Sequence, residues 1–394
     1  MAAATSHYAL PFFDAAHHTL ADGLAAWAAT QQVDESDDRA ACRQWVRRLG
    51  DAGWLRYCVP AAFGGALPAL DSRALVILRE TLAYHSPLAD FAFAMQGLGS
   101  GAITLAGSAE QQQAYLPAVA RGDTIAAFAL SEPDAGSDVG AMATTARADA
   151  DGGFVLDGVK TWISNGGIAD YYCVFAKTEP ERGSRGITAF IVDADTPGLD
   201  DSEHIHVMAP HPLASVRLTQ CRVPAGAQLG PREGGFKLAM RTLDIFRASV
   251  AGAALGMARR ALDEAVAYTR RRPMFGQHLA DFQLTQARLG DMAALLDAAA
   301  LLTYRAAWLR DCVGTATPEQ AQAYTAQAAM AKMAATENAQ RVIDMALQMH
   351  GGQGVRVGNT IEHLYRDIRS LRIYEGATEV QQLIIGKSVL KGAA

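Results

Sequence analysis

The chain has 394 residues, of which half are hydrophobic and 19% are charged. This length suggests two or three domains, and the composition lacks the low hydrophobicity and high charge of disordered proteins. Lys and Arg number 35 against 41 Asp and Glu, and the resulting net charge of −6 argues against a dedicated nucleic-acid-binding protein.

Residues 1–122 are predicted to be helical. Alanine, leucine and glutamine recur, and the few turn signals are local, as at Phe63-Gly64-Gly65 and His85-Ser86-Pro87. The segment 102–116 can run as a helix until Pro117.

Residues 123–232 have a different texture. Short runs rich in strand-forming residues lie at 154–164, 171–177, 186–192, 204–207 and 215–218. Glycine- and proline-containing turns at 151–153, 165–167 and 196–198 separate them. This alternation predicts an antiparallel sheet or a small barrel.

Residues 233–394 return to a helical pattern. Apolar residues keep a 3.6-residue period over several turns, at Phe236, Met240, Leu243, Val250, Met257 and Ala261. A later helix opens with Thr317-Pro318-Glu319-Gln320, a capping box with proline at the first helical position. Helices, then a sheet, then helices predict an α+β protein with a β domain held between helical ones.

Cysteine usage and the N-terminus bear on the compartment. The five cysteines are scattered and form no C-x-x-C pair, so they indicate neither a disulfide framework nor a zinc site. The first residues show no basic segment followed by an apolar one, and no apolar run approaches the ~18 residues of a membrane span. We therefore expect a cytoplasmic protein with reduced thiols, no metal and no membrane span.

Two segments of the central region carry residues suited to binding a ligand. The loop 131–138 follows a β-like run and offers hydroxyl and N–H groups, although such a loop is more often only a turn. Trp162 and Ser164 are two apart in a predicted strand and so share a face. An indole beside a hydroxyl suits a flat heteroaromatic with a polar edge, and the alternative is an ordinary core tryptophan.

Three further segments lie in the last region. Arg270-Arg271-Arg272 at a helix end can bind a phosphate, or simply complement the helix dipole. The run 348–354 ends a helix in a glycine-rich loop that lacks the G-x-G-x-x-G pattern, which excludes a Rossmann site. Glu375, if desolvated, could have a raised pKa suitable for a general base, whereas a lone glutamate is normally solvated.

The order and spacing of these segments closely resemble the motif series of the acyl-CoA dehydrogenases. The matching runs are 131–138, 160–165, 272–276 with 281–283, 348–354, and Arg366-Asp367 followed by 373–376. The likeness covers nearly the whole chain. It implies an N-terminal helical domain over 1–122, a central β-sheet or barrel domain over 123–232 and a C-terminal four-helix-bundle domain over 233–394, assembled as a homotetramer.

The resemblance also implies FAD as the cofactor. Ser131 would contact the flavin pyrimidine edge, Ser164 would lie near flavin N5, and Trp162 would cover the isoalloxazine. Contacts to the FAD of a neighbouring subunit are implied for Arg272, Phe275, Gln283, Gln348 and Gly352, with Arg272 on the diphosphate. Many members have threonine where this chain has Ala377, and Thr378 is the candidate to replace that hydroxyl.

The implied reaction is α,β-dehydrogenation of an acyl-CoA thioester to the trans-2-enoyl-CoA. Glu375 would abstract the α-proton, flavin N5 would take the β-hydride, and electrons would pass to an electron-transfer flavoprotein. Some relatives place an alternative base where this chain has Phe246, which leaves Glu375 as the base. The residues implied to contact substrate are Ser137, Asp244, Arg247, Tyr374 and Gly376.

Several alternatives stay open at this point. An oxidase or flavin monooxygenase-like member would use O2, and a non-catalytic flavin-binding subunit would not turn over. The acyl group cannot be read from the sequence, although Gly97 and Gly99 weakly favour a roomy pocket for a short, branched or cyclic group. The segment 209–215 departs from the frequent Gly-x-Arg-x-Ser pattern, so substrate contacts there are expected to be unusual.

Overall fold

The computed structural model describes residues 6–314 and 317–392. The chain divides into two compact units. Unit 1 comprises Met1–Gln32, Asp71–Asp90 and Arg247–Ala394, and unit 2 comprises Val33–Leu70 and Phe91–Phe246. Helices α4 (Pro87–Ala106) and α6 (Gly235–Arg271) each begin in one unit and end in the other.

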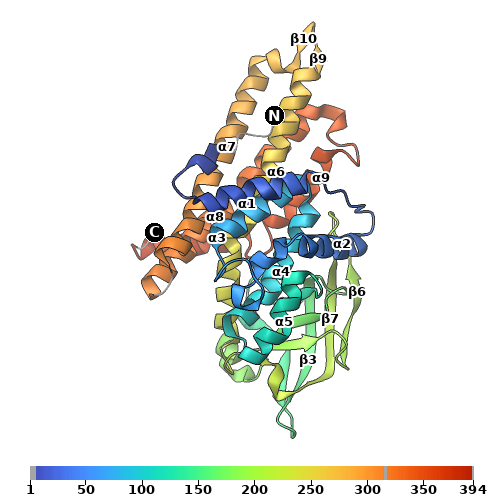
Figure 1. Cartoon of the computed structure of the whole chain (residues 1–394), viewed down its shortest axis with the longest axis vertical. Helices are drawn as coiled ribbons and strands as arrows, with labels where there is room; N and C mark the ends of the chain where they lie inside the picture. The colour runs from blue at the N-terminus through green and yellow to red at the C-terminus, as the bar shows by residue number, and fades with distance from the viewer. Residues whose placement is uncertain (1–5, 315–316, 393–394) are drawn as a thin grey trace. The chain divides into compact units, whose positions relative to one another are not determined.

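Unit 2 is built on an eight-stranded sheet. The strand order is β6-β7-β3-β2-β4-β5-β8, with β1 also pairing with β4. Pairing is antiparallel except where β4 meets β1 and β2, and β3, β7 and β6 can be followed side by side in Figure 1. The strands are β1 (Ala126–Ala129), β2 (Thr145–Ala148), β3 (Phe154–Ser164), β4 (Tyr171–Lys177), β5 (Ile187–Asp193), β6 (Leu199–Ile205), β7 (Leu213–Val223) and β8 (Gln228–Leu229).

The expected sheet is therefore present, but β4 pairs in parallel with β1 and β2, and the central strand β2 lies outside the predicted runs. The strands at one edge also have other limits than predicted. Strand β6 begins at Leu199, five residues before the predicted run, and β7 continues to Val223. The start of β6 and the end of β7 were missed for the same reason. Their exposed positions at the edge of the sheet carry polar side chains, so the apolar–polar alternation that predicts a strand is absent there. Strand β4, in contrast, was readable because nearly every residue in it is apolar and buried.

Unit 2 also contains α2 (Asp38–Asp51) and α5 (Ala109–Arg121). The predicted helix over 102–116 is wrong in its limits, since α4 ends at Ala106 and α5 continues through Pro117. The break comes at Ser108, whose hydroxyl accepts from Gln111 N at 3.2 Å while the Gln111 side chain accepts from Ser108 N at 2.9 Å. This capping box starts a new helix, and Pro117 then lies inside it.

Unit 1 is helical. Helices α7, α9 and α10 pack against the long helix α8, and α3 packs against both α1 and α7. The predicted start of α8 is confirmed, because Thr317 caps it with the reciprocal Gln320 bond. The helices are α1 (Ala15–Ala28), α3 (Ser72–His85), α7 (Gln283–Trp308), α8 (Pro318–His350), α9 (Thr360–Leu371) and α10 (Thr378–Leu390).

A short hairpin joins α6 to α7 in unit 1. Strands β9 (Pro273–Met274) and β10 (Gln277–His278) form it, at the tip visible in Figure 1. Within the described residues one segment, Gln283–Val313, has the length and apolar composition of a membrane span. Because α7 packs against α8 and α3, and core helices of soluble proteins share this composition, the segment is weak support for a membrane span.

Candidate active site

Glu375 lies on the turn between α9 and α10 in an uncommon backbone conformation. Its φ is 51°, and that of Gly376 is 92°. The φ of Gly376 favours glycine, and a Cβ there would also lie 2.3 Å from Gln381 Nε2, which holds the turn. A non-glycine residue with positive φ is a feature that clusters at functional sites, where the surrounding structure holds the strain.

Two side chains hold this turn by its carbonyl groups. Lys332 Nζ, from the middle of α8, donates to the Gly376 carbonyl at 2.7 Å. Gln381 Nε2, from the first part of α10, donates to the same oxygen at 2.9 Å and to the Glu375 carbonyl at 3.4 Å. The backbone on which Glu375 sits is therefore fixed from both helices.

Thr378, a candidate FAD contact by sequence, has a partner inside unit 1. Its hydroxyl donates to Glu337 Oε1 at 2.6 Å, and Arg372 Nε donates to the same oxygen at 2.8 Å. Glu337 thus ties the residues before and after the Glu375 turn to α8. An FAD contact by Thr378 stays a prediction.

The Glu375 carboxylate is desolvated. Both of its oxygens are buried and have no hydrogen-bond partner among the described residues. Burial raises the pKa of Glu375, and the negative charge of Asp90 adds to this shift. The positive charges of Arg79, Lys332 and Arg247 oppose it. This is the setting that the sequence interpretation required of a general base.

Arg79 and Asp90 form a buried pair that sequence reasoning missed. Arg79 also donates to Ser249 Oγ at 3.1 Å. Burial raises the pKa of the Tyr374 hydroxyl, and the positive charge of Arg79 opposes this shift. A signal present in the sequence is that Arg79 directly follows the apolar run Leu75-Val76-Ile77-Leu78.

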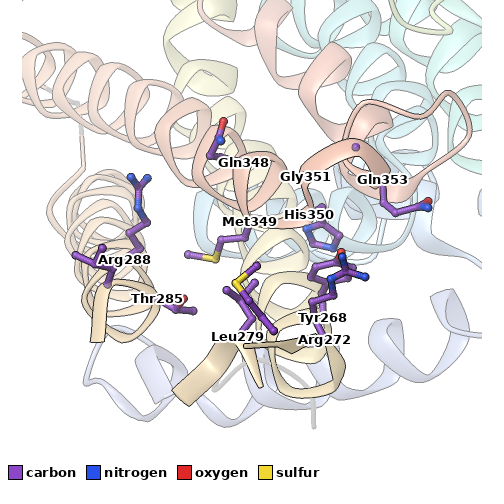
Figure 2. Close-up of a pocket in the computed structure, with 13 residues that line it drawn as sticks. Tyr268, Arg272, Leu279, Thr285, Arg288, Gln348, Met349, His350, Gly351 and Gln353 are labelled. Carbon is purple, nitrogen blue, oxygen red and sulfur yellow. The ribbon is translucent and has the colours of Figure 1, made fainter. Parts of the chain in front are cut away.

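A second candidate site lies where α6, α7 and α8 approach one another in unit 1. It is a cavity of ≈ 530 Å³ with 13 lining residues, drawn in Figure 2. Arg272, Gln348 and Gly352, which the sequence assigned to FAD, all line it. Phe275 and Gln283 do not; Phe275 is 91% exposed on the hairpin turn, and Gln283 is exposed at the start of α7.

The cavity has the chemistry that FAD phosphates require. Arg288, which sequence reasoning missed, lines it together with Arg272, and two guanidinium groups suit a diphosphate. Gly352 has open space where a Cβ would stand, so a ligand can approach its backbone. The Tyr268 ring stacks on the His350 ring with centroids 4.3 Å apart and forms one wall.

In unit 2, the structure brings Ser131 next to the strand that carries Trp162. Thr161 N donates to the Ser131 carbonyl at 3.0 Å. A β-bulge between Lys160 and Ile163 places Trp162 at φ 58° with 59% of its surface exposed. The alternative of a core tryptophan is thus excluded within this unit, and the indole is free to lie against a ligand.

A buried ion pair fixes the loop that follows Ser131. Lys160 Nζ lies 2.7 Å from Glu132 Oε1, and both side chains are buried. The Glu132 carboxylate also accepts from Ala143 N at 2.5 Å and Thr144 N at 3.1 Å. Burial lowers the pKa of Lys160 to about 8, although the Glu132 charge opposes that shift. Ser137 is exposed on this loop.

The glycines of α4 do not create open space in unit 2. A Cβ at Gly97 would lie 2.6 Å from the Phe246 ring, and one at Gly101 would lie 3.0 Å from it. A Cβ at Gly99 would lie 2.6 Å from the Ala126 side chain. These glycines therefore make room for protein atoms, which removes the argument for a roomy pocket.

The remaining substrate candidates lie along α6 and the unusual segment. Asp244 is half-buried, whereas Arg247 is buried and its charge reaches Glu375. In the segment 209–215, His211 is buried and its ring stacks on Phe91 with centroids 4.6 Å apart. Contacts of these residues with CoA or the acyl group stay predictions.

Comparison with protein families decides the relationship. Three models, described as the N-terminal, middle and C-terminal domains of acyl-CoA dehydrogenase, match residues 13–123, 127–221 and 233–390. The chain belongs to the acyl-CoA dehydrogenase family. It is therefore an FAD-dependent oxidoreductase of acyl-CoA metabolism, with the helical, β-sheet and helical architecture of that family.

The relatives of this chain include proteins named as dehydrogenases and proteins named as reductases. Human mitochondrial short-chain specific acyl-CoA dehydrogenase is 40% identical over 88% of this chain and 82% of that protein. A 3-(aryl)acrylate reductase of Clostridium sporogenes is 39% identical over 95% and 98% of the two chains. A caffeyl-CoA reductase–Etf complex subunit of Acetobacterium woodii is 37% identical over 92% and 94%.

Solved structures agree with this relationship. Butyryl-CoA dehydrogenase of Megasphaera elsdenii superposes with a TM-score of 0.89 at 30% identity, covering 96% of this chain and 99% of that one. An acyl-CoA dehydrogenase of Bacillus anthracis complexed with FAD also gives 0.89 at 30% identity, covering 97% of this chain and 68% of that one.

Proposed function

We propose that the protein catalyses α,β-dehydrogenation of an acyl-CoA thioester, with Glu375 as the base that removes the α-proton. One observation carries this proposal. The Glu375 carboxylate is buried, has no hydrogen-bond partner in the described chain, and sits on a turn held in a left-handed conformation. A structural glutamate would satisfy its buried oxygens, whereas a base must leave them available to a substrate.

The surroundings of Glu375 match this task. A carboxylate of ordinary pKa is too weak a base for an α-C–H bond, so burial that raises the pKa of Glu375 narrows the gap. The positive charges around it keep the ionised form accessible. FAD, when bound, supplies the acceptor for the β-hydride.

The FAD contacts belong to the same proposal. Ser131, Trp162 and Ser164 would contact the flavin ring. The exposure of the Trp162 side chain supports this role, because an exposed indole can pack against a ligand. Arg272, Gln348 and Gly352, joined by Arg288, would bind the phosphates and sugar of a neighbouring subunit's FAD at the cavity of Figure 2. Phe275 and Gln283 would add contacts from the exposed hairpin and the start of α7.

For the substrate we propose a short acyl-CoA, with contacts from Ser137, Asp244, Arg247, Tyr374 and Gly376. The names of the short-chain and butyryl relatives support a short chain. The reductase relatives support a second candidate, in which the same site runs toward saturation of an enoyl-CoA. Oxidation of the reduced protein by an enoyl-CoA in the absence of O2 would favour it.

We also propose an electron-transfer flavoprotein as the redox partner, a homotetramer as the assembly and the cytoplasm as the location. The Etf-complex relative supports the partner. Helix α10 supports self-association, because Leu383, Val389 and Leu390 are more than half exposed on it. The mass of the purified protein in solution tests the assembly, and a homotetramer predicts four times the mass of one chain.

The test is anaerobic bleaching of the bound flavin by a panel of acyl-CoA thioesters. Wild type should bleach with short saturated thioesters, and Glu375→Gln should retain FAD without bleaching. Glu379→Gln, which alters an exposed glutamate four residues later, is the matched control and should bleach normally. Bleaching by Glu375→Gln at the wild-type rate would overturn the proposal, and peroxide release in air without an added acceptor would indicate an oxidase.

A further inference from the structure

Lys332 is a buried cation that the proposed reaction does not use. It lies in the middle of α8 with no exposed surface, among alanines at positions 328, 329, 331 and 335. Its Nζ donates to the Gly376 carbonyl at 2.7 Å. Within the described chain its ammonium forms no ion pair with a carboxylate closer than 4.0 Å.

A hydrogen bond alone does not explain a charge at this position. Burial of an ammonium without a close counter-ion is costly, and burial lowers the pKa of Lys332 to about 8. Gln381 already donates to the Gly376 carbonyl at 2.9 Å, so a neutral side chain suffices for that oxygen. The charge therefore needs a separate reason.

The charged groups that face Glu375 show what that reason is. Arg79 of α3 is held by Asp90 of α4, and this partner's negative charge counteracts its influence. Arg247 of α6 and Lys332 of α8 supply the other positive charges. Lys332 also bonds the turn on which Glu375 sits, through the Gly376 carbonyl.

Other groups near Lys332 are already engaged. Glu337, one and a half turns further along α8, accepts from Arg372 and Thr378, and Glu379 of α10 is exposed. The influence of Glu375 on Lys332 is the largest of the charge effects that favour its ammonium form. The two side chains thus stabilise each other's charged state.

We propose that Lys332 is a positioning residue for Glu375: its ammonium fixes the Gly376 carbonyl, and its charge sets the pH at which Glu375 becomes an active base. This inference rests on the proposed function, because it assumes that Glu375 removes the α-proton. Loss of the positive charge makes the Glu375 carboxylate less stable and raises its pKa. The acid limb of the pH profile, where the rate falls because Glu375 becomes protonated, must therefore move to higher pH.

The experiment is the pH dependence of anaerobic flavin bleaching in Lys332→Met, Lys332→Gln and Lys332→Arg. In the Met and Gln variants the midpoint of the acid limb should move up by about 1 pH unit. At a pH below that midpoint, bleaching should then be about tenfold slower than in wild type. Lys332→Arg keeps the charge and should stay near wild type. Lys237→Met, a change at an exposed lysine of α6, is the control and should leave the profile unchanged.

The outcomes separate the two proposals. If wild type bleaches but the acid limb of Lys332→Gln coincides with it, the role of Lys332 is overturned. An equal shift in Lys332→Arg would also overturn it, because charge would then not be the cause. If Lys332→Met fails to fold, the Gln and Arg variants decide. If none of the acyl-CoA thioesters in the panel bleaches the flavin of the wild-type protein, the proposed function itself fails.

Discussion

Arg79 and Asp90 are joined by two parallel hydrogen bonds in unit 1. Arg79 Nε lies 2.8 Å from Asp90 Oδ1, and Arg79 Nη2 lies 2.9 Å from Asp90 Oδ2. Both side chains are almost fully buried. Because Asp90 sits at the start of α4 and Arg79 in the middle of α3, the pair links these two helices, and both of its charges act on Glu375.

Asp90→Asn should destabilise the protein by about 3–5 kcal/mol, since it leaves the Arg79 charge buried without its counter-ion. Urea unfolding measures this change. Glu179→Gln, which removes an exposed ion pair with Arg232, is the matched control and should cost less than about 1 kcal/mol. An equal loss of unfolding free energy in the two variants would show that the buried pair stabilises the protein no more than the exposed pair does.

The same substitution predicts a pH effect of opposite sign to that of Lys332→Gln. The Asp90 charge raises the pKa of Glu375, so its removal lowers that pKa, and the base stays ionised at lower pH. The acid limb of flavin bleaching should therefore move to lower pH in Asp90→Asn, measured at a temperature where the variant is folded. A shift to higher pH would contradict the assigned charge arrangement.

Arg272→Met should weaken FAD binding. Loss of one charge-assisted contact to a phosphate is worth roughly 1.5–3 kcal/mol, which is about ten- to a hundredfold in Kd. Titration of the apoprotein with FAD, followed by flavin fluorescence, measures it. Arg270→Met, two residues earlier and outside the cavity lining, should bind FAD like wild type; a matching loss in both variants would count against the cavity as the phosphate site.

Ala377→Thr should stabilise the protein. Ala377 is the N-cap of α10 and offers no side-chain bond to the first turn, and a cap hydroxyl is worth about 0.5–2 kcal/mol. Thermal unfolding should show a raised Tm. Ala377→Val adds a similar volume without the hydroxyl, so a rise of the same size in this variant would refute capping as the cause.

Local signals predicted the parts of the fold that local chemistry dictates. The Thr317–Gln320 capping box and the apolar strand β4 were readable because a few adjacent residues determine each. Strand β6 was not, since an edge strand can be polar throughout, and neither was the continuation of α5 through Pro117.

The candidate site divides in the same way. Motif spacing gave Glu375 and the cavity residues Arg272 and Gln348, because these occur in short recognisable runs. Lys332 and Arg79 were missed, because their roles depend on burial against residues far away in the sequence. Around Lys332 such long-range burial of charge leaves no local pattern, whereas Arg79 at least follows an apolar run directly.

The removal of the α-proton by Glu375 is tested most directly by proton exchange. Wild type loaded with FAD is incubated in D2O with an acyl-CoA, and deuterium at the α-carbon is followed by mass spectrometry. We predict that wild type and Glu379→Gln exchange the α-proton, whereas Glu375→Gln with full FAD content slows exchange by at least a hundredfold. Exchange by Glu375→Gln at the wild-type rate would contradict the account.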